Sequence, residues 1–226
     1  MIILAHRGNM EGPDRLGENR CEIIARALAR GFGVETDIRR WVDGRLYISH
    51  DRQAGGAAET AELHASLWAT YPDCLIALNI KERGHERATL DLLQRHRLLD
   101  QAFMFDMELI EPLPGEIARE LRSLNPLARL ASRISDRGET AQKALSLPGE
   151  YIWLDEMDSP WASAAVIQKL HDAGRVVIGV SRDLHGERPE ACYRRWDEFA
   201  EWGVEGICTD WPLLAADRLG QSVRVA

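Results

Sequence analysis

Eight short apolar runs, separated by amphipathic stretches, are the feature that most restricts the fold of this chain. Near-continuous apolar strands that alternate with helices are typical of a parallel sheet covered by helices. Eight such units predict a closed (β/α)8 TIM barrel. An open, doubly wound sheet fits the same pattern and remains the alternative. The predicted strands cover residues 2–5, 33–38, 74–80, 102–105, 128–132, 151–154, 176–181 and 206–208.

Three of the stretches between these runs carry clear helix signals. Residues 21–31 end in a glycine that suits a helix C-terminus, and residues 85–99 have leucines at helical spacing. Residues 159–174 begin with Ser159 as a predicted N-cap, followed by proline in the first turn, and end at Gly174. These signals place helices between the predicted strands.

One irregularity follows the second predicted strand. Asp43-Gly44 is a turn signal, and the next residues, RLYISHD (45–51), have the character of a returning strand. The sequence therefore predicts a short hairpin that projects from the end of the second strand.

Length and composition restrict the class of protein. The 226 residues, 45% of them hydrophobic and 28% charged, predict one globular domain over residues 1–226. A net charge of −8 argues against a nucleic-acid partner, and no apolar stretch is long enough for a membrane span. The first residues lack a basic leader, and the four cysteines are scattered without a CxxC pair. These features predict reduced thiols and a cytoplasmic location.

Polar or ionisable residues follow nearly every predicted strand. In a barrel, the carboxyl ends of the strands meet at one rim, where active sites lie. Any one of these residues alone is more simply a solvated loop residue or a helix cap, but together they predict a polar rim. They are His6-Arg7, Glu35 and Asp37, Asn79 and Lys81, Asp106, Ser132-Arg133, Asp155, Ser181-Arg182-Asp183 and Thr209-Asp210.

Glu35 and Asp37 are the most informative pair at this rim. They are two residues apart on one strand, so both carboxylates face the same side. Two parallel carboxylates repel each other unless they are solvated or a positive charge lies between them. A salt bridge to Arg39 or Arg7 would supply that charge, but a hard cation such as Mg²⁺ or Ca²⁺ also prefers oxygen ligands. We interpret the pair as ligands of a divalent cation.

Two histidines and two basic residues fall near this pair. His6 and His50 are at predicted strand ends, and each is suited to act as a general acid or base near neutral pH. The remaining histidines lie mostly in helix-like segments, where an ordinary hydrogen-bonded role is the simpler interpretation. Arg7 and Lys81 supply positive charge suited to a phosphate group.

Six segments, in order along the chain, resemble the glycerophosphodiester phosphodiesterase family. That family has the pattern HRG, EN, ExD, a strand ending in HD, ExK, and a terminal G-[VI]-[DE]-G-x-x-T-[DN]-x-P. The similarity runs from the first predicted strand to the last, and its most specific part is in the first fifty residues. The matching segments are AHRG (5–8), GEN (17–19), VETDIR (34–39), DGRLYISHD (43–51), LNIK (78–81) and GVEGICTDWP (203–212).

The resemblance implies a (β/α)8 barrel that uses a divalent metal to hydrolyse glycerophosphodiesters to sn-glycerol 3-phosphate and an alcohol. Carried over by position, it implies that His6 and His50 form the acid/base pair. It implies that Glu35 and Asp37 are metal ligands, and that Arg7 binds the phosphate. Lys81 would bind phosphate or steady the metal site, and Glu18 would hold the rim near His6.

The chain departs from the family pattern at two places that concern the site. The third acidic ligand is replaced by Asn79, whose amide oxygen can still bind Mg²⁺ or Ca²⁺ with one negative charge fewer. Asp106 is the predicted replacement. The segment between Asp51 and Leu78 is also shorter than in common bacterial members, which leaves the glycerol specificity open. Asp155, Trp161, Arg182 and His185 are then the rim residues expected to set the substrate, with Asp155 and Arg182 in substrate or phosphate binding.

The sequence therefore predicts a metal-dependent phosphoric diester hydrolase that acts on a glycerophosphodiester or a similar small polar phosphodiester. One alternative is a phospholipase D-like lyase that releases a cyclic phosphate. Another is a non-catalytic barrel that binds a phosphorylated ligand, an alternative that Asn79 keeps open.

Overall fold

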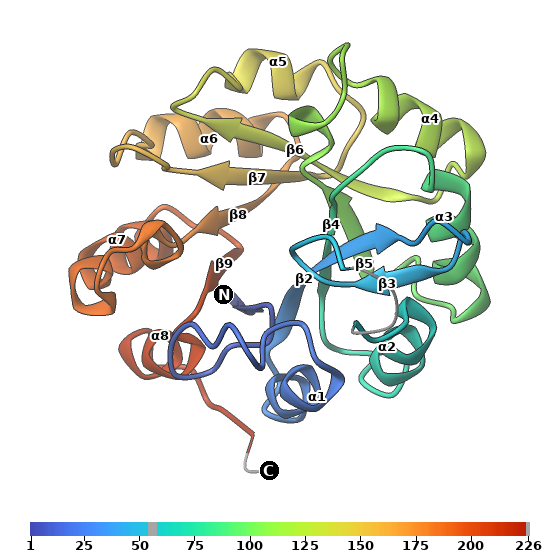
Figure 1. Ribbon diagram of the computed structural model, residues 1–226. Coiled ribbons are helices and arrows are strands. Elements are labelled where there is room, and N and C mark those ends of the chain that lie inside the picture. Colours follow the sequence, from blue (N-terminus) through green and yellow to red (C-terminus); the bar gives the residue numbers. More distant parts are fainter. Residues whose placement is uncertain (54–57, 225–226) are drawn as a thin grey trace.

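The computed structural model describes residues 1–53 and 58–224. In this part of the chain, eight strands form a closed parallel barrel, and the helices surround it (Figure 1). The strands follow one another around the barrel in chain order, and the first strand also pairs with the second parallel strand, which closes the sheet. The barrel strands are β1 (Ile2–His6), β2 (Gly33–Arg40), β4 (Ile76–Ile80), β5 (Ala102–Phe105), β6 (Arg129–Ser135), β7 (Tyr151–Asp155), β8 (Val176–Val180) and β9 (Gly206–Thr209). The predicted barrel is confirmed, and the open doubly wound sheet is excluded.

Helices occupy the connections between successive barrel strands. The larger hydrophobic cluster lies between them and the outer face of the barrel, whereas a smaller one fills the barrel interior. The helices are α1 (Cys21–Ala29), α2 (Ala61–Trp68), α3 (Glu86–Arg95), α4 (Glu116–Leu124), α5 (Ala141–Leu145), α6 (Ala164–Asp172), α7 (Pro189–Glu201) and α8 (Pro212–Arg218), with short 3-10 turns η1 (Met107–Leu109) and η2 (Arg182–His185). None of the described helices has the length and apolar character needed to cross a membrane.

The predicted hairpin is present. Strand β3 (Leu46–Ile48) runs antiparallel to the end of β2, and Gly44 takes the positive φ of 89° that the turn requires. Trp41 and Tyr47 stack across the hairpin with ring centroids 4.6 Å apart. This small structure carries the chain back, so that His50 follows β3 near the carboxyl end of β2.

The helix predicted from Ser159 begins later than the sequence signals indicate. Helix α6 starts at Ala164 with Ser163 in the N-cap position, although Gly174 ends it as predicted, with φ 71°. The difference has a tertiary cause, because Arg195 of α7 holds the buried Glu156 carboxylate, which in turn accepts hydrogen bonds from the backbone N–H groups of Trp161 and Ala162. These bonds hold the segment after β7 as a loop and delay the start of the helix.

Strand register places the predicted site residues opposite one another. His6 of β1 pairs with Glu35 of β2, and Asp37 of β2 pairs with Asn79 of β4. In parallel strands, paired residues point to the same face. Beneath them, the barrel interior is filled by apolar side chains that include Leu4, Phe105 and Trp153. The polar residues therefore lie at the carboxyl end of the barrel, above a packed apolar floor.

Candidate active site at the carboxyl end of the barrel

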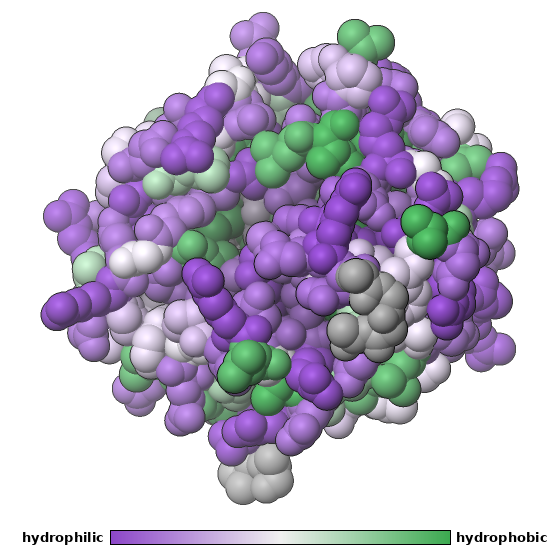
Figure 2. All heavy atoms as spheres, in the orientation of Figure 1, coloured by the Kyte–Doolittle hydropathy of each residue, from purple (hydrophilic) through white to green (hydrophobic). Residues whose placement is uncertain are grey.

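The centre of the molecular face seen in Figure 1 is largely hydrophilic (Figure 2). Many of the predicted rim residues are nevertheless buried, including Glu35, Asp37, Asn79, Asp106 and Asp155. Charged groups at such depth need partners of opposite charge, hydrogen bonds or a bound ion. Each of these buried groups is therefore expected to have at least one such partner.

The imidazole of His6 lies between two carboxylates. Nδ1 is 2.7 Å from Oδ1 of Asp210, which follows β9, and Nε2 is 3.7 Å from Oε2 of Glu35. Asn9 also donates a hydrogen bond to Asp210 Oδ1, at 2.8 Å, which fixes the carboxylate. Burial opposes protonation of the imidazole, but the hydrogen bond to Asp210 and the charge of Glu35 outweigh it and raise the pKa of His6. The hydrogen bond to Asp210 thus holds the His6 imidazole in one orientation.

Glu35 and Asp37 form a buried pair of carboxylates inside the rim. Their residues are only 2% and 1% exposed. Oε2 of Glu35 and Oδ1 of Asp37 have no hydrogen-bond partner among the described residues. Burial, together with the neighbouring charge of Asp37, raises the pKa of Glu35 to about 7. A divalent cation would neutralise both groups and provide a partner for the two unsatisfied oxygens.

Asp37 is surrounded by positive charge and hydrogen-bond donors. Arg7 Nε lies 3.3 Å from Oδ2, and Lys81 Nζ lies 3.5 Å from Oδ1. Asn19 donates to Oδ2 at 2.8 Å. Burial opposes ionisation, but Lys81 and Arg7 outweigh it and lower the pKa of Asp37. Glu18 accepts a hydrogen bond from Arg7 Nη1 at 3.0 Å, so it holds the guanidinium from the other side.

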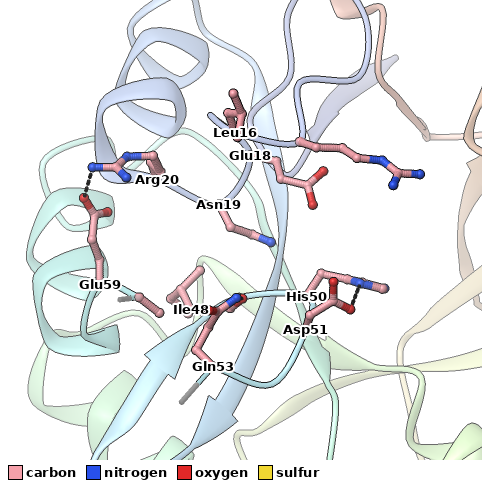
Figure 3. A pocket seen from close by; sticks show the side chains of 12 residues that line it. Leu16, Glu18, Asn19, Arg20, Ile48, His50, Asp51, Gln53 and Glu59 are labelled. Carbon is pink, nitrogen blue, oxygen red and sulfur yellow. Dashed lines mark hydrogen bonds and ion pairs between the residues drawn. The ribbon is translucent and has the colours of Figure 1, made fainter. Parts of the chain in front are cut away.

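His50 is more exposed than His6, with 38% of its side chain accessible. Its Nδ1 lies 2.9 Å from Asp51 Oδ1, and Figure 3 shows it at a pocket that Glu18 and Asn19 also line. Burial and the charge of Arg7 lower the pKa of His50, although Asp37 acts in the opposite direction. His50 therefore lies close enough to Arg7 and Asp37 for both charges to affect its pKa. The pKa values of the two histidines are therefore shifted in opposite directions.

Asn79 and Asp106, the two candidates for a third ligand, are hydrogen-bonded to each other. Asn79 Nδ2 donates to Asp106 Oδ2 at 3.0 Å, and Arg133 Nη1 donates to Asp106 Oδ1 at 2.7 Å. Both oxygens of Asp106 therefore accept hydrogen bonds from neighbouring side chains. Asn79 also lies opposite Asp37 in the register of the neighbouring strand.

Asp155 and Arg182 both pair with neighbouring side chains at the rim. Asp155 accepts from Arg133 Nη2 at 2.5 Å and lies 2.6 Å from His185 Nε2. Arg182 pairs with Glu187 at 2.5 Å and donates to a backbone carbonyl. Asp155 thus holds two cationic or polar side chains, and the charge of Arg182 is already balanced by a carboxylate.

Several residues that build the site were not among the predicted site residues. The sequence indicates Asp210 and Arg133 only as strand-end residues and suggests no individual role for Asn9 or Asn19. Asn19 lies in the GEN segment and Asp210 in the terminal TDWP segment, so the motifs contained a signal for both. Neither motif indicates which side chain each residue contacts.

No protein-family model and no curated protein sequence matches the chain. Solved structures do match it over nearly its full length. A phosphodiesterase from Oleispira antarctica, solved in complex with the product sn-glycerol-3-phosphate, has a TM-score of 0.73 and 15% identity, over 98% of this chain and 97% of the other. A glycerophosphodiester phosphodiesterase from Agrobacterium tumefaciens has a TM-score of 0.70 and 18% identity, over 96% and 99%.

A third match is a protein from Silicibacter pomeroyi whose own assignment as a glycerophosphoryl diester phosphodiesterase is provisional. It has a TM-score of 0.75 and 19% identity, over 98% of this chain and 95% of the other. At such identities the likeness is one of fold. The chain therefore shares the complete barrel of the glycerophosphodiester phosphodiesterases.

Proposed function

We propose that this protein is a metal-dependent phosphoric diester hydrolase that acts on a glycerophosphodiester or a similar small polar phosphodiester. The observation that carries the proposal is the buried pair of Glu35 and Asp37, whose unpartnered oxygens lie beside the imidazole of His6 and the basic side chains of Arg7 and Lys81. The product complex of the Oleispira antarctica phosphodiesterase, which has the same fold, supports the choice of substrate class.

The donor set fits a hard divalent cation such as Mg²⁺ or Ca²⁺. Glu35 and Asp37 would supply carboxylate oxygens, and Asn79 would supply an amide oxygen, all from adjacent strands. When bound, such a cation offsets negative charge on the non-bridging phosphate oxygens.

Arg7 and Lys81 would bind the phosphate group. Both approach Asp37 with incomplete hydrogen bonding, at 3.3 and 3.5 Å, and Nε of Arg7 has no hydrogen-bond partner among the described residues. A phosphate oxygen beside them would receive charge-assisted hydrogen bonds. Glu18 keeps the guanidinium of Arg7 directed toward the site.

His6 and His50 would carry the protons. One imidazole accepts the proton of the attacking hydroxyl, and the other donates a proton to the leaving alkoxide. Their opposite pKa shifts support this division, because one protonated and one neutral imidazole can then coexist at the same pH. The nucleophile is water for direct hydrolysis. A neighbouring hydroxyl of the substrate would instead give a cyclic phosphate first.

A panel of phosphodiesters assayed with Mg²⁺, Ca²⁺ or Mn²⁺ tests the proposal. We expect turnover that chelation removes and that is abolished in His6→Ala and in His50→Ala, while both variants remain folded by circular dichroism. His96→Ala, at the end of α3 away from the rim, is the matched control and should retain activity. Phosphorus NMR of the product distinguishes a monoester from a cyclic ester.

Two results would contradict this function. Turnover that persists in either histidine variant would remove the acid/base assignment. Absence of Mg²⁺ and Ca²⁺ binding at millimolar concentration, measured by calorimetry, would favour a barrel that binds a phosphorylated ligand without catalysis.

A further inference from the structure

A second group of potential metal ligands lies outside the candidate active site, near the starts of α1 and α2. In the described residues, Cys21, Glu59 and His64 place a sulfur, a carboxylate oxygen and an imidazole nitrogen within 4.8 Å of one another. Cys21 is the first residue of α1, Glu59 precedes α2, and His64 is on its first turn. The three groups are therefore brought together by the packing of α1 against α2.

His64 provides independent evidence that a ligand belongs here. The residue is 0% exposed, and neither ring nitrogen has a hydrogen-bond partner among the described residues. Its Nε2 lies 3.2 Å from Oε2 of Glu59, close enough for an ion pair but outside hydrogen-bond geometry. Leaving a polar group buried without a hydrogen bond is unfavourable, and folded proteins generally avoid it. Glu59 Oε2 already accepts a hydrogen bond from the backbone N–H of Cys21 at 2.6 Å, so the unsatisfied group is the imidazole. A cation between Glu59 and His64 would satisfy it.

The chemistry of the three ligands selects a borderline or soft metal. Thiolate, imidazole and carboxylate are the groups that bind Zn²⁺, whereas Mg²⁺ and Ca²⁺ prefer oxygen atoms alone. Zinc–ligand bonds of about 2.0–2.3 Å in a tetrahedron place neighbouring ligand atoms roughly 3.3–3.8 Å apart. The 3.2 Å between Glu59 Oε2 and His64 Nε2 is close to this spacing. All three ligand atoms lie within 4.8 Å of one another, so the longer separations would have to shorten only slightly to bind one ion.

Access to the group comes from the side of the pocket shown in Figure 3. The Glu59 side chain is 26% exposed and lines that pocket together with Arg20 and His50. Arg20 approaches the other carboxylate oxygen, Oε1, at 3.9 Å, and its own side chain is largely exposed. A cation can therefore enter from solvent, and a water molecule can complete its coordination.

We propose that Cys21, Glu59 and His64 form a Zn²⁺ site that links the start of α1 to the start of α2. On binding, the sulfur–hydrogen bond of Cys21 breaks, its proton passes to solvent, and the thiolate binds the metal without any change of oxidation state. Burial and the charge of Glu59 raise the pKa of this thiol to about 12, so the metal must displace the proton. The site does not depend on the activity proposed above.

Cobalt is the probe for the first experiment, because Co²⁺ bound to a thiolate shows a sulfur-to-metal charge-transfer absorption in the near ultraviolet. The purified full-length protein, kept reduced with a phosphine, should bind one equivalent of Co²⁺ with this band. Zn²⁺ should then displace it, since it binds such sites more tightly than Co²⁺. Cys21→Ser should remove the band, whereas Cys74→Ser, at a buried cysteine elsewhere, and Glu35→Gln, in the active-site pair, should leave it unchanged.

Zinc affinity and thermal unfolding provide the second measurement. Loss of an outer-shell partner weakens metal binding 10–100-fold, so loss of the thiolate in Cys21→Ser should weaken Zn²⁺ binding by about 100-fold or more. Zn²⁺ should raise the Tm of the unmodified protein clearly more than that of Cys21→Ser or Glu59→Gln, in which only the candidate active site can still bind a divalent cation. Without metal, Cys21→Ser should unfold at nearly the same temperature as the unmodified protein. The proposal is overturned if the Co²⁺ complex lacks the thiolate band, if Cys21→Ser retains it, or if Zn²⁺ raises the Tm of Cys21→Ser equally.

Discussion

The Nδ1 atom of His6 lies 2.7 Å from Oδ1 of Asp210, so the carboxyl end of β9 orients an imidazole at the carboxyl end of β1. The two residues are 204 positions apart in the sequence. They meet because β1 pairs with β9 and closes the barrel. A side-chain carboxylate on Nδ1 leaves Nε2 to face the candidate metal pair.

Asp210→Asn tests whether this orientation matters for turnover. General acid–base catalysis contributes about 10²–10⁴-fold, so we expect kcat to fall by a large part of that range with little change in KM. Because the Asp210 hydrogen bond raises the pKa of His6, its loss should also move the limb of the pH–rate profile set by His6 to lower pH. Steady-state kinetics over a pH series provides both readouts. An unshifted profile with reduced kcat would indicate structural damage only.

Asn79→Asp and Asp106→Asn distinguish the two candidates for the third ligand. Adding a carboxylate at position 79 should tighten Mg²⁺ or Ca²⁺ binding by about tenfold, because affinity follows ligand charge. Asp106→Asn should leave that affinity nearly unchanged, since Arg133 and Asn79 engage both of its oxygens. Calorimetric titration of metal-free protein measures each affinity.

The double exchange Asn79→Asp with Asp106→Asn is the control for this comparison. It keeps the number of carboxylates and restores a donor–acceptor pair between the two positions. We expect it to bind metal as tightly as Asn79→Asp alone. Loss of metal binding in Asp106→Asn would instead identify Asp106 as the ligand.

Arg133 should contribute to stability through two buried ion pairs, with Asp106 at 2.7 Å and Asp155 at 2.5 Å. Arg133→Met leaves both carboxylates without this partner, and breaking a buried pair typically costs about 3–5 kcal/mol. Adding Asp106→Asn and Asp155→Asn should recover much of the loss. Urea unfolding measures these differences, and Arg137→Met, at an exposed pair with Asp158, should change the midpoint little.

Recovery is the decisive part of that experiment. If the triple variant is no more stable than Arg133→Met, the loss comes from packing of the long side chain rather than from uncompensated charge.

Glu108 should make stability depend on pH. Burial raises its pKa from 4.5 to about 7. The folded state therefore keeps a proton that the unfolded state has released, so the contribution of Glu108 to the free energy of unfolding falls as pH rises from 4.5 to about 7. Glu108→Gln should remove this decline and be relatively more stabilising at pH 8 than at pH 5. Urea unfolding at both pH values, with the exposed Glu120→Gln as control, checks the sign.

The local sequence determined the barrel and much of its chemical character. Apolar runs alternating with amphipathic stretches specified eight strand–helix units. Their order was compatible with a closed barrel or an open doubly wound sheet, and the pairing of β1 with β2 shows that the barrel is closed. The two-residue spacing of Glu35 and Asp37 was sufficient to place both carboxylates on one face, because side chains alternate along a strand. The Asp43-Gly44 signal was sufficient for the hairpin, since a positive φ at Gly44 depends on local geometry.

Only the tertiary structure decided which partners these groups have. The sequence placed Asp106 and Arg133 at the rim but did not show that the guanidinium engages Asp106. It predicted a helix from Ser159, but Glu156, by binding the backbone of Trp161 and Ala162, delays the helix to Ala164.

The physical reason is the range of the interactions. Hydrophobic periodicity and turn preferences act over a few neighbouring residues, so they can be read from one segment at a time. The pairing of His6 with Asp210, and the meeting of Cys21 with His64, depend on barrel closure and helix packing. Those contacts are set by the folded chain as a whole.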